Sequence, residues 1–290
     1  IGKHFSVNVM LSKESVKTRL NEAGISYTEF SYMLLQAYDY LELYRRHDCR
    51  LQIGGSDQWG NITAGLDLIR RIEGSDSPEA HALTVPLVTK ADGTKFGKTA
   101  DGAIWLDPEL TTPYAFYQFW LNTDDRDVEQ FLRFFSMSSR ADLEAIFREH
   151  EEAPFKRTAQ RALADELTTL VHGERACQQA SAAGKALFSG GDLDAIDEET
   201  VAAALASAPH ASWASTDSDE WPSVVDLLVV SGLAESRGAA RRTIKEGGAY
   251  LNNERIVDES ALADQGALVH GRWWLLRRGK KSFASVELQR

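Results

Sequence analysis

The chain has 290 residues, a net charge of −11 and only two cysteines, Cys49 and Cys177. That length allows about two domains of ordinary size, and the acidic balance excludes a nucleic-acid-binding surface that covers the whole protein. Two cysteines exclude a disulfide scaffold and a cysteine-rich zinc site, and they fit a reducing compartment. No apolar run reaches the ~18 residues of a membrane span, so we expect a cytoplasmic protein.

Composition divides the chain into four stretches. Residues 1–106 mix short apolar strands with helices, and residues 107–186 place apolar side chains at helical spacing throughout. Residues 187–221 are acidic and rich in small residues, which predicts a linker with one short helix near 199–206. Residues 222–290 carry a net charge of +3, against −14 for the rest. A basic module attached to an acidic body indicates nucleic-acid binding.

The first candidate site is a polar face on a helix expected over 28–44. Ser26 and Glu29 form a capping box ahead of it. Three polar side chains share one face at i, i+4 and i+7 spacing: Tyr32, Gln36 and Asp39. Their neighbours are mostly apolar, so we expect a well-buried helix whose unpaired polar groups would each cost about 1–3 kcal/mol. The pattern predicts either a site for a polar ligand or the solvated face of an amphipathic helix.

The second candidate site is a glycine turn between a strand expected over 49–53 and a helix. Its sequence is GGSDQWGN, residues 54–61. Ligands of open α/β sheets bind where strands end and helices begin. Gly55 would let the backbone approach a ligand closely, and Asp57 is suited to a pair of ribose hydroxyls. The alternative is a tight turn in which Ser56 or Asp57 caps the helix.

The third candidate site is a lysine-rich loop. A strand expected over 83–88 runs into KADGTKFGKT, residues 90–99. Lys95 and Lys98, followed by Thr99, make a positive loop rich in hydrogen-bond donors, which suits the charge that develops on a leaving pyrophosphate. The spacing of a Walker loop is absent. The alternative is an ordinary solvated loop.

The basic module predicts two short helices, a Gly-Gly turn, a strand and an Asn-Asn hairpin turn. Its cations form two clusters: Arg237, Arg241, Arg242 and Lys245, then Arg277, Arg278, Lys280 and Lys281. Such clusters neutralise phosphates and give salt-dependent RNA binding; the alternative is a solvated charged face. Trp273 and Trp274 would either stack on bases or pack in the core.

The three candidate sites occur together in one order, and their sequences are SYTEFSYMLLQAYDYL, CRLQIGGSDQWGNITAGLDLIRR and LVTKADGTKFGKT. This combination resembles tyrosyl-tRNA synthetases of the bacterial type, which are class I aminoacyl-tRNA synthetases. The resemblance continues into the basic end, which is similar to an RNA-binding module of a ribosomal small-subunit protein. It implies an α/β fold: the C-terminal part of a Rossmann-like catalytic domain over 1–106, a helical anticodon-side domain over 107–186, and a small α+β RNA-binding module over 222–290.

The resemblance also implies roles. Tyr32 and Gln36 would hold the amino group of tyrosine and Asp39 its hydroxyl, with Gln58 beside them. The other implied contacts are Gln52, Gly55, Gln58 and Asp57 around the adenylate, with Asp57 on the ribose, and Lys95, Lys98 and Thr99 on the pyrophosphate. The enzyme would activate tyrosine with ATP and transfer it to the 3′ end of transfer RNA. Magnesium would accompany ATP without a protein metal site, and the protein would be a homodimer with residues 5–25 near its interface.

One departure from the family stands out. The His-Ile-Gly-His signature is absent, since none of the seven histidines lies in that pattern: His4, His47, His81, His150, His172, His210 and His270. With Ile1 as its first residue, we expect the chain to begin inside the catalytic domain. The alternatives are an RNA-binding scaffold derived from a synthetase, for example in intron splicing, an inactive synthetase fragment, or the sister enzyme for tryptophan. Five intact site residues argue against a retired active site: Gln36, Asp39, Asp57, Lys95 and Lys98. Asp39 paired with Gln36, together with the basic C-terminal module, favours tyrosine.

Overall fold

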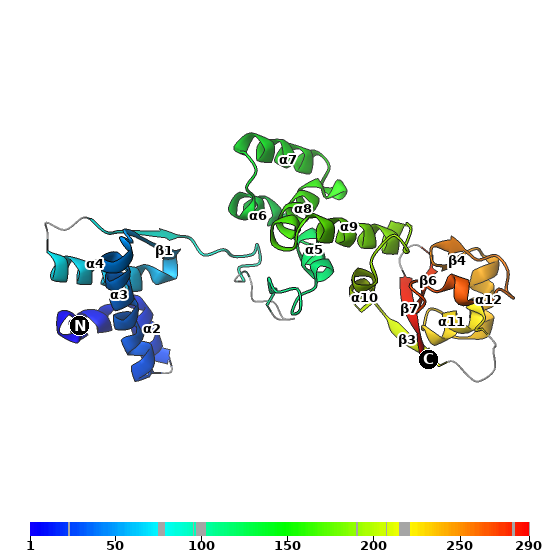
Figure 1. Cartoon of the computed structure of the whole chain (residues 1–290), viewed down its shortest axis with the longest axis horizontal. Helices are drawn as coiled ribbons and strands as arrows, with labels where there is room; N and C mark the ends of the chain where they lie inside the picture. Colours follow the sequence, from blue (N-terminus) through cyan, green and yellow to red (C-terminus); the bar gives the residue numbers. More distant parts are fainter. Residues whose placement is uncertain are drawn as a thin grey trace. The chain divides into compact units, whose positions relative to one another are not determined.

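The computed structural model describes residues 1–290 apart from 23, 75–78, 95, 97–102, 190, 207, 215–220, 280–281 and 290. The chain forms two compact units, residues 1–98 and 99–290. Figure 1 shows their helices and strands, coloured along the sequence from blue at the N-terminus to red at the C-terminus. The mixture of helices with a parallel and a mixed sheet agrees with the predicted α/β class.

The first unit is a layer of helices against a two-stranded sheet. Its elements are η1 (Gly2–His4), α1 (Val7–Ser12), α2 (Glu14–Glu22), α3 (Tyr27–His47), β1 (Leu51–Gly55), η2 (Ser56–Gln58), α4 (Trp59–Glu73) and β2 (His81–Val85). Strands β1 and β2 are parallel, with Leu51 opposite His81 and Gly55 opposite Val85. A parallel pair joined through a helix is the βαβ unit of α/β folds, so α4 and the turn before it lie at the carboxyl end of β1.

Helix α3 begins at the predicted capping box. The Ser26 hydroxyl accepts from the Glu29 amide at 3.2 Å, and the Glu29 carboxylate accepts from the Ser26 amide at 3.0 Å. These hydrogen bonds with Ser26 hold the pKa of Glu29 below its usual value. At the other end of α3, Arg45 forms an ion pair of 2.6 Å with Glu73 of α4. Both ends of α3 are therefore fixed by its own sequence and by α4.

The two long helices of this unit approach each other closely at Gly65. A Cβ at this position would lie 2.8 Å from the Tyr40 ring, closer than side chains approach one another. Tyr40 is 1% exposed, and its hydroxyl donates to the His81 carbonyl of β2 at 2.8 Å. Burial, and then the neighbouring Cys49, raises the pKa of Tyr40. Glycine in α4 thus lets one tyrosine of α3 reach β2.

The helical part of the second unit follows the predicted periodicity. It contains α5 (Pro113–Leu121), α6 (Val128–Phe135), α7 (Arg140–Glu152), η3 (Pro154–Lys156), α8 (Thr158–His172) and α9 (Glu174–Ser189). The aromatic stripe of α5 supplies core residues, as predicted: Tyr114, Phe116, Tyr117 and Trp120 are all 5% exposed or less. Burial raises the pKa of Tyr114 and of Tyr117 to about 12, and the Tyr117 hydroxyl donates to Asp165 at 2.9 Å.

The stretch 187–221, expected as a linker, holds more structure than its composition indicated. The predicted short helix is present as α10 (Glu198–Ala206), capped by Asp197, which accepts from the Thr200 amide at 2.8 Å. The unexpected element is β3 (His210–Ala214), which pairs in parallel with β7 (Ser282–Gln289) near the end of the chain. Because this pairing joins residues 75 apart, local composition carries no sign of it.

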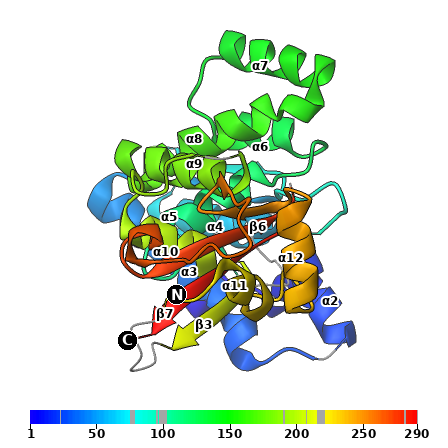
Figure 2. The same cartoon turned by 90° about the vertical axis from the view of Figure 1, so that its right-hand side faces the viewer.

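The basic module is a five-stranded sheet with two helices against it (Figures 1 and 2). The strand order is β3-β7-β6-β4-β5. The further elements are α11 (Val224–Val230), α12 (Arg237–Lys245), β4 (Ala249–Leu251), β5 (Glu254–Arg255), η4 (Gln265–Ala267) and β6 (Trp273–Arg278). The predicted hairpin turn is present, since Asn252 and Asn253 have φ values of 48° and 69°. Trp273 and Trp274 are 3% and 0% exposed, so both pack in the interior and the base-stacking alternative is wrong.

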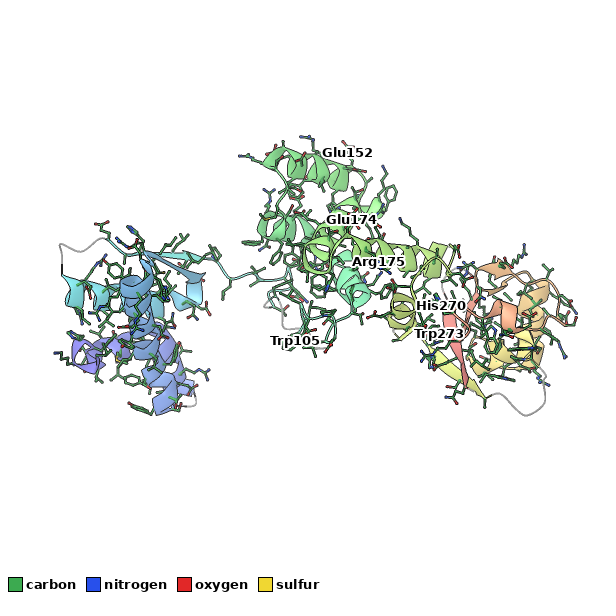
Figure 3. All side chains as sticks on the ribbon, in the orientation of Figure 1. Trp105, Glu152, Glu174, Arg175, His270 and Trp273 are labelled. Atoms are coloured by element: carbon green, nitrogen blue, oxygen red, sulfur yellow. The ribbon has the colours of Figure 1, made fainter. Side chains whose placement is uncertain are left out.

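The module contacts the helical part at α9 and at the segment just before α10. Figure 3 shows His270 and Trp273 on the part of the module next to α10. His270 Nε2 lies 2.7 Å from the Ile196 carbonyl oxygen, and the Asn253 amide donates to the Ala186 carbonyl at 2.8 Å. Within the described parts of the chain, no helix is both long and apolar enough to cross a membrane.

The close approach at Gly65 gives a direct test of the packing in the first unit. Gly65→Ala should lower the free energy of unfolding by about 1–3 kcal/mol, because the added methyl must displace the buried Tyr40 ring. Gly60→Ala, in the same helix, is the matched control: its Cβ would meet only the Lys13 side chain at 3.6 Å. Chemical denaturation of both variants measures the difference, and equal stabilities would contradict this packing.

Candidate functional site

Helix α3 places its three predicted polar side chains on one accessible face. Tyr32 is 43% exposed, Asp39 is exposed and Gln36 is half-buried. The helix is less buried than its apolar composition predicted, since Leu35 on the same side is 65% exposed. Only the opposite face is in the core, with Met33, Ala37, Tyr40, Leu41 and Tyr44. Neither the Gln36 nor the Asp39 side chain has a hydrogen-bond partner among the described residues, so both are available to a ligand.

A hydrogen-bonded chain joins this face to the glycine turn. The Asn61 side-chain amide donates to the Tyr32 hydroxyl at 2.8 Å and to the Gln58 side-chain oxygen Oε1 at 3.1 Å. The Gln58 amide in turn lies 3.4 Å from the Asp57 carboxylate. Asn61 is 4% exposed, whereas the groups that it links are accessible. The first two predicted sites are therefore one site, held together by a buried amide.

Asn61 was missed as a site residue. It is the last residue of the GGSDQWGN octet, and its residue type alone does not distinguish it from a helix residue on the surface. The available signal was the spacing itself: Asn61 follows Gln58 by three residues, which places both on one side of the first turn of α4.

The turn after β1 exposes Asp57 instead of using it as a helix cap. Gln58 is the N-cap residue of α4, and no side chain caps this helix. The alternative in which Ser56 or Asp57 caps α4 is therefore wrong. A Cβ at Gly55 would lie 2.6 Å from Asp57 Oδ1 and 3.0 Å from the Leu87 side chain. Glycine at this position leaves space for the Asp57 carboxylate beside the backbone.

Gln52, the second residue of β1, contributes an unsatisfied acceptor. Its Oε1 is buried and has no hydrogen-bond partner among the described residues. A buried carbonyl oxygen without a donor costs about 1–3 kcal/mol. A ligand that donates a hydrogen bond at this position would recover that cost.

The lysine loop is described only in its first half. A tight turn closes it at Asp92, whose carboxylate accepts from the Thr94 amide at 2.9 Å, and the Phe96 amide returns to the Val88 carbonyl at 3.1 Å. Lys95, Lys98 and Thr99 lie outside the described residues. Their predicted role therefore stays a prediction.

The predicted basic clusters of the module differ in how far their charge is compensated. Arg237 pairs with Asp226 at 2.5 Å and Lys245 with Glu259 at 3.1 Å. Arg241 and Arg242 are exposed, and in the described part of the chain neither forms an ion pair. Arg278 donates to the Leu233 carbonyl at 3.0 Å, and Arg277 stacks on Tyr250. Lys280 and Lys281 lie outside the described residues.

Comparisons with known proteins agree in both units. Residues 1–189 match the family described as "tRNA synthetases class I (W and Y)", and residues 202–286 match the "Tyrosine--tRNA ligase SYY-like C-terminal domain". The chain is 60% identical to the tyrosine–tRNA ligase of Thermobifida fusca over 100% of its own length and 67% of the relative's. It is 61% identical to the tyrosine–tRNA ligase of Streptomyces griseus, over 99% of its own length and 67% of the relative's.

Solved structures give the same assignment for the fold. A C-terminally truncated mitochondrial tyrosyl-tRNA synthetase of Aspergillus nidulans matches with a TM-score of 0.55 and 31% identity, over 65% of this chain and 53% of the other. The corresponding protein of Coccidioides posadasii matches with a TM-score of 0.53 and 33% identity, over 62% of this chain and 51% of the other. The chain spans about two thirds of the length of the curated relatives. These comparisons do not confirm the expectation that it lacks the first part of the catalytic domain.

The space beside Gly55 can be tested by filling it. Gly55→Ala should turn the Asp57 carboxylate away from the turn and break its contact with Gln58, because a methyl group and Asp57 Oδ1 cannot both occupy this space. The free energy of unfolding should change by less than about 1 kcal/mol, since the Asp57 side chain is exposed and can turn toward solvent. A crystal structure of the variant measures the displacement.

Gly54→Ala is the matched control in the same turn. Its Cβ would meet Ile62 at 3.1 Å and the Gln58 Cβ at 3.2 Å, and Asp57 is not among its close neighbours. An Asp57 carboxylate that keeps its place in Gly55→Ala would contradict the geometry given above.

Proposed function

This chain belongs to the tyrosine–tRNA ligase family of class I tRNA synthetases, and we propose how its residues carry that reaction. Tyrosine, ATP and transfer RNA are the substrates. The tyrosine carboxylate attacks the α-phosphate of ATP, which gives tyrosyl adenylate and pyrophosphate, and the tyrosyl group then passes to the 3′ end of transfer RNA. No protein side chain attacks a substrate, so catalysis consists of positioning and electrostatic stabilisation.

The observation that carries this proposal is the hydrogen-bonded chain from Tyr32 through Asn61 and Gln58 to Asp57. It connects the polar face of α3 with the turn at the carboxyl end of β1, where α/β folds bind nucleotides. We assign the amino group of tyrosine to Tyr32 and Gln36, with Gln58 nearby. We assign the ribose hydroxyls of the adenylate to the Asp57 carboxylate. Gly55 and Gln52 would line the adenylate pocket, with Gln52 as a hydrogen-bond acceptor.

Asp39 is the proposed partner of the tyrosine hydroxyl. A site that hydrogen-bonds a substrate hydroxyl rejects an analogue without it, because the site's own polar group would be left unpaired, and tyrosine-specific synthetases are the standard example of this principle. Asp39 has no protein partner among the described side chains, which supports its assignment to a ligand. Phenylalanine would leave the carboxylate unsatisfied.

Four further parts of the proposal rest on the chemistry of the residues and on the family. Lys95, Lys98 and Thr99 stabilise the leaving pyrophosphate. Mg²⁺ arrives with ATP; no group of three or more potential ligands for a metal occurs among the described His, Cys, Asp and Glu side chains. The protein is a homodimer with residues 5–25 near the interface, and it works in the cytoplasm, where translation takes place and the free Cys49 and Cys177 stay reduced.

The domain division 1–106, 107–186 and 222–290 also remains our proposal, with one adjustment. Strand β3 pairs with β7, so the RNA-binding module takes in residues 210–214 as well.

The test of the activation step is tyrosine-dependent exchange between ATP and pyrophosphate, with phenylalanine in parallel. Lys98→Ala should lower the exchange rate about 100-fold and leave the dissociation constant of tyrosine unchanged, because the lysine acts on charge that develops in the transition state. Lys90→Ala, in the same loop but outside the KFGKT sequence, should retain the rate. Equal losses of rate and tyrosine affinity in Lys98→Ala would contradict this role, and exchange with phenylalanine as substrate would contradict tyrosine specificity.

The role of the module is tested by removing it. Deletion of residues 208–290 should spare the exchange reaction and weaken the charging of transfer RNA, since the exposed arginines of the module neutralise phosphates. The cut precedes β3 because a cut at 222 would leave this strand without its partner. Charging that is unchanged at physiological salt would rule out RNA binding by the module.

A further inference from the structure

The sheet of the module has one face that its helices do not cover. Ala249, Leu251, Trp274, Leu276 and Val286 belong to the core formed with α11 and α12. Side chains that alternate with these along the strands point to the opposite face. None of Tyr250, Arg277 and Phe283 belongs to that core. The end of this second face nearest the hairpin turns is therefore free of α11 and α12.

Four side chains form a row across this second face. Tyr250 of β4 lies directly opposite Arg255 of β5 on one side and Arg277 of β6 on the other, and Arg277 lies opposite Phe283 of β7. Directly opposed residues of antiparallel strands project to the same face. Aromatic rings and guanidinium groups thus alternate across four strands in what we name the Arg–Tyr row: Phe283, Arg277, Tyr250 and Arg255.

The Arg–Tyr row consists of planar side-chain groups that are partly exposed to solvent. The guanidinium carbon of Arg277 lies 4.1 Å from the centre of the Tyr250 ring. Arg255 is exposed, and the other three side chains are half-buried. A Cβ at Gly247 would overlap the Arg255 guanidinium, so the glycine gives this arginine its place beside the sheet. The row therefore places four planar side chains side by side on one sheet face, with Arg277 stacked on Tyr250 and Arg255 exposed to solvent.

The charge of the Arg–Tyr row is not compensated within the described structure. Neither Arg255 nor Arg277 has an ion-pair partner among the described acids, and the buried Nε of Arg277 has no hydrogen-bond partner. On the same face of β7, Glu287 is already bound to Arg272 at 2.6 Å. On α12, by contrast, Arg237 and Lys245 both have acidic partners. An anionic ligand would meet two arginines that no protein carboxylate occupies.

We propose that the Arg–Tyr row binds an unpaired segment of RNA, with bases stacked on its planar groups and phosphates on Arg255 and Arg277. Bases stack on aromatic rings and on guanidinium planes only when they are unpaired and splayed out, whereas the bases of a duplex are hidden inside it. Alternating cations and rings on a sheet face offer both contacts at once. The inference rests on the proposed function for the presence of an RNA substrate, and it adds a surface separate from the arginines of α12.

The test is the binding of a labelled single-stranded RNA of about six nucleotides to the full chain, measured by fluorescence anisotropy. A hairpin of base-paired RNA serves as the second probe. Tyr250→Leu and Arg277→Gln should each lower the affinity for the single-stranded RNA about fivefold or more, because each removes a stacking surface. Tyr250→Phe should bind as the wild type does, because it keeps the ring. Arg140→Gln in α7 makes the same change of charge elsewhere and should have no effect.

Three outcomes would overturn the proposal. In the first, Tyr250→Leu binds the single-stranded RNA as tightly as the wild type does. In the second, Arg140→Gln loses as much affinity for this RNA as the row variants do, and in the third, the row variants lose as much affinity for the hairpin as for the single-stranded RNA. Arg255→Gln, at an exposed position, provides a second variant if Tyr250→Leu unfolds the module, and circular dichroism shows which has happened. Tyrosine-dependent exchange should be unchanged in every row variant, so absence of exchange in the wild type would count against the proposed function and not against the row.

Discussion

The close packing of α3 on α4 is the constraint on which the candidate site depends. Gly65 has no side chain, so the Tyr40 ring fits against α4 and its hydroxyl reaches the His81 carbonyl of β2. At the other end of the same contact, Asn61 donates to Tyr32 and to Gln58. Packing and hydrogen bonding together bring the polar face of α3 next to the turn after β1, the surfaces that we propose for tyrosine and for the adenylate.

In the second unit, the basic module that we propose binds RNA is fixed by hydrogen bonds to the helical part. Its module is held against the helical part by contacts from two residues with positive φ, Asn253 and His270. Both side chains reach a backbone carbonyl of the helical part, at Ala186 and at Ile196. Some arginines of the module form ion pairs within the protein, as Arg237 does with Asp226, while Arg241 and Arg255 have no acidic partner among the described residues. The number of basic residues in the sequence therefore overestimates the positive charge that is available to bind phosphate.

Local signals in the sequence predicted most of the elements. The capping box at Ser26, the helical periods of 107–186 and the Asn-Asn turn each depend on neighbouring residues, and each is present. The failures concern contacts between distant residues. Strand β3 exists only because β7 pairs with it, and the burial of both Trp273 and Trp274 depends on what covers each face of the sheet. Asn61 was missed for the same reason, since its partner Tyr32 is on another helix.

The most direct measurement is a double-mutant cycle between Tyr32 and Asn61 in tyrosine-dependent ATP–pyrophosphate exchange. Tyr32→Phe removes the acceptor and Asn61→Ala removes the donor of the 2.8 Å hydrogen bond that joins the two halves of the site. If this bond positions Tyr32 for tyrosine, the two changes in kcat/KM should be coupled by about 1 kcal/mol. Effects that simply add would contradict the account, because the face of α3 and the turn after β1 would then act independently.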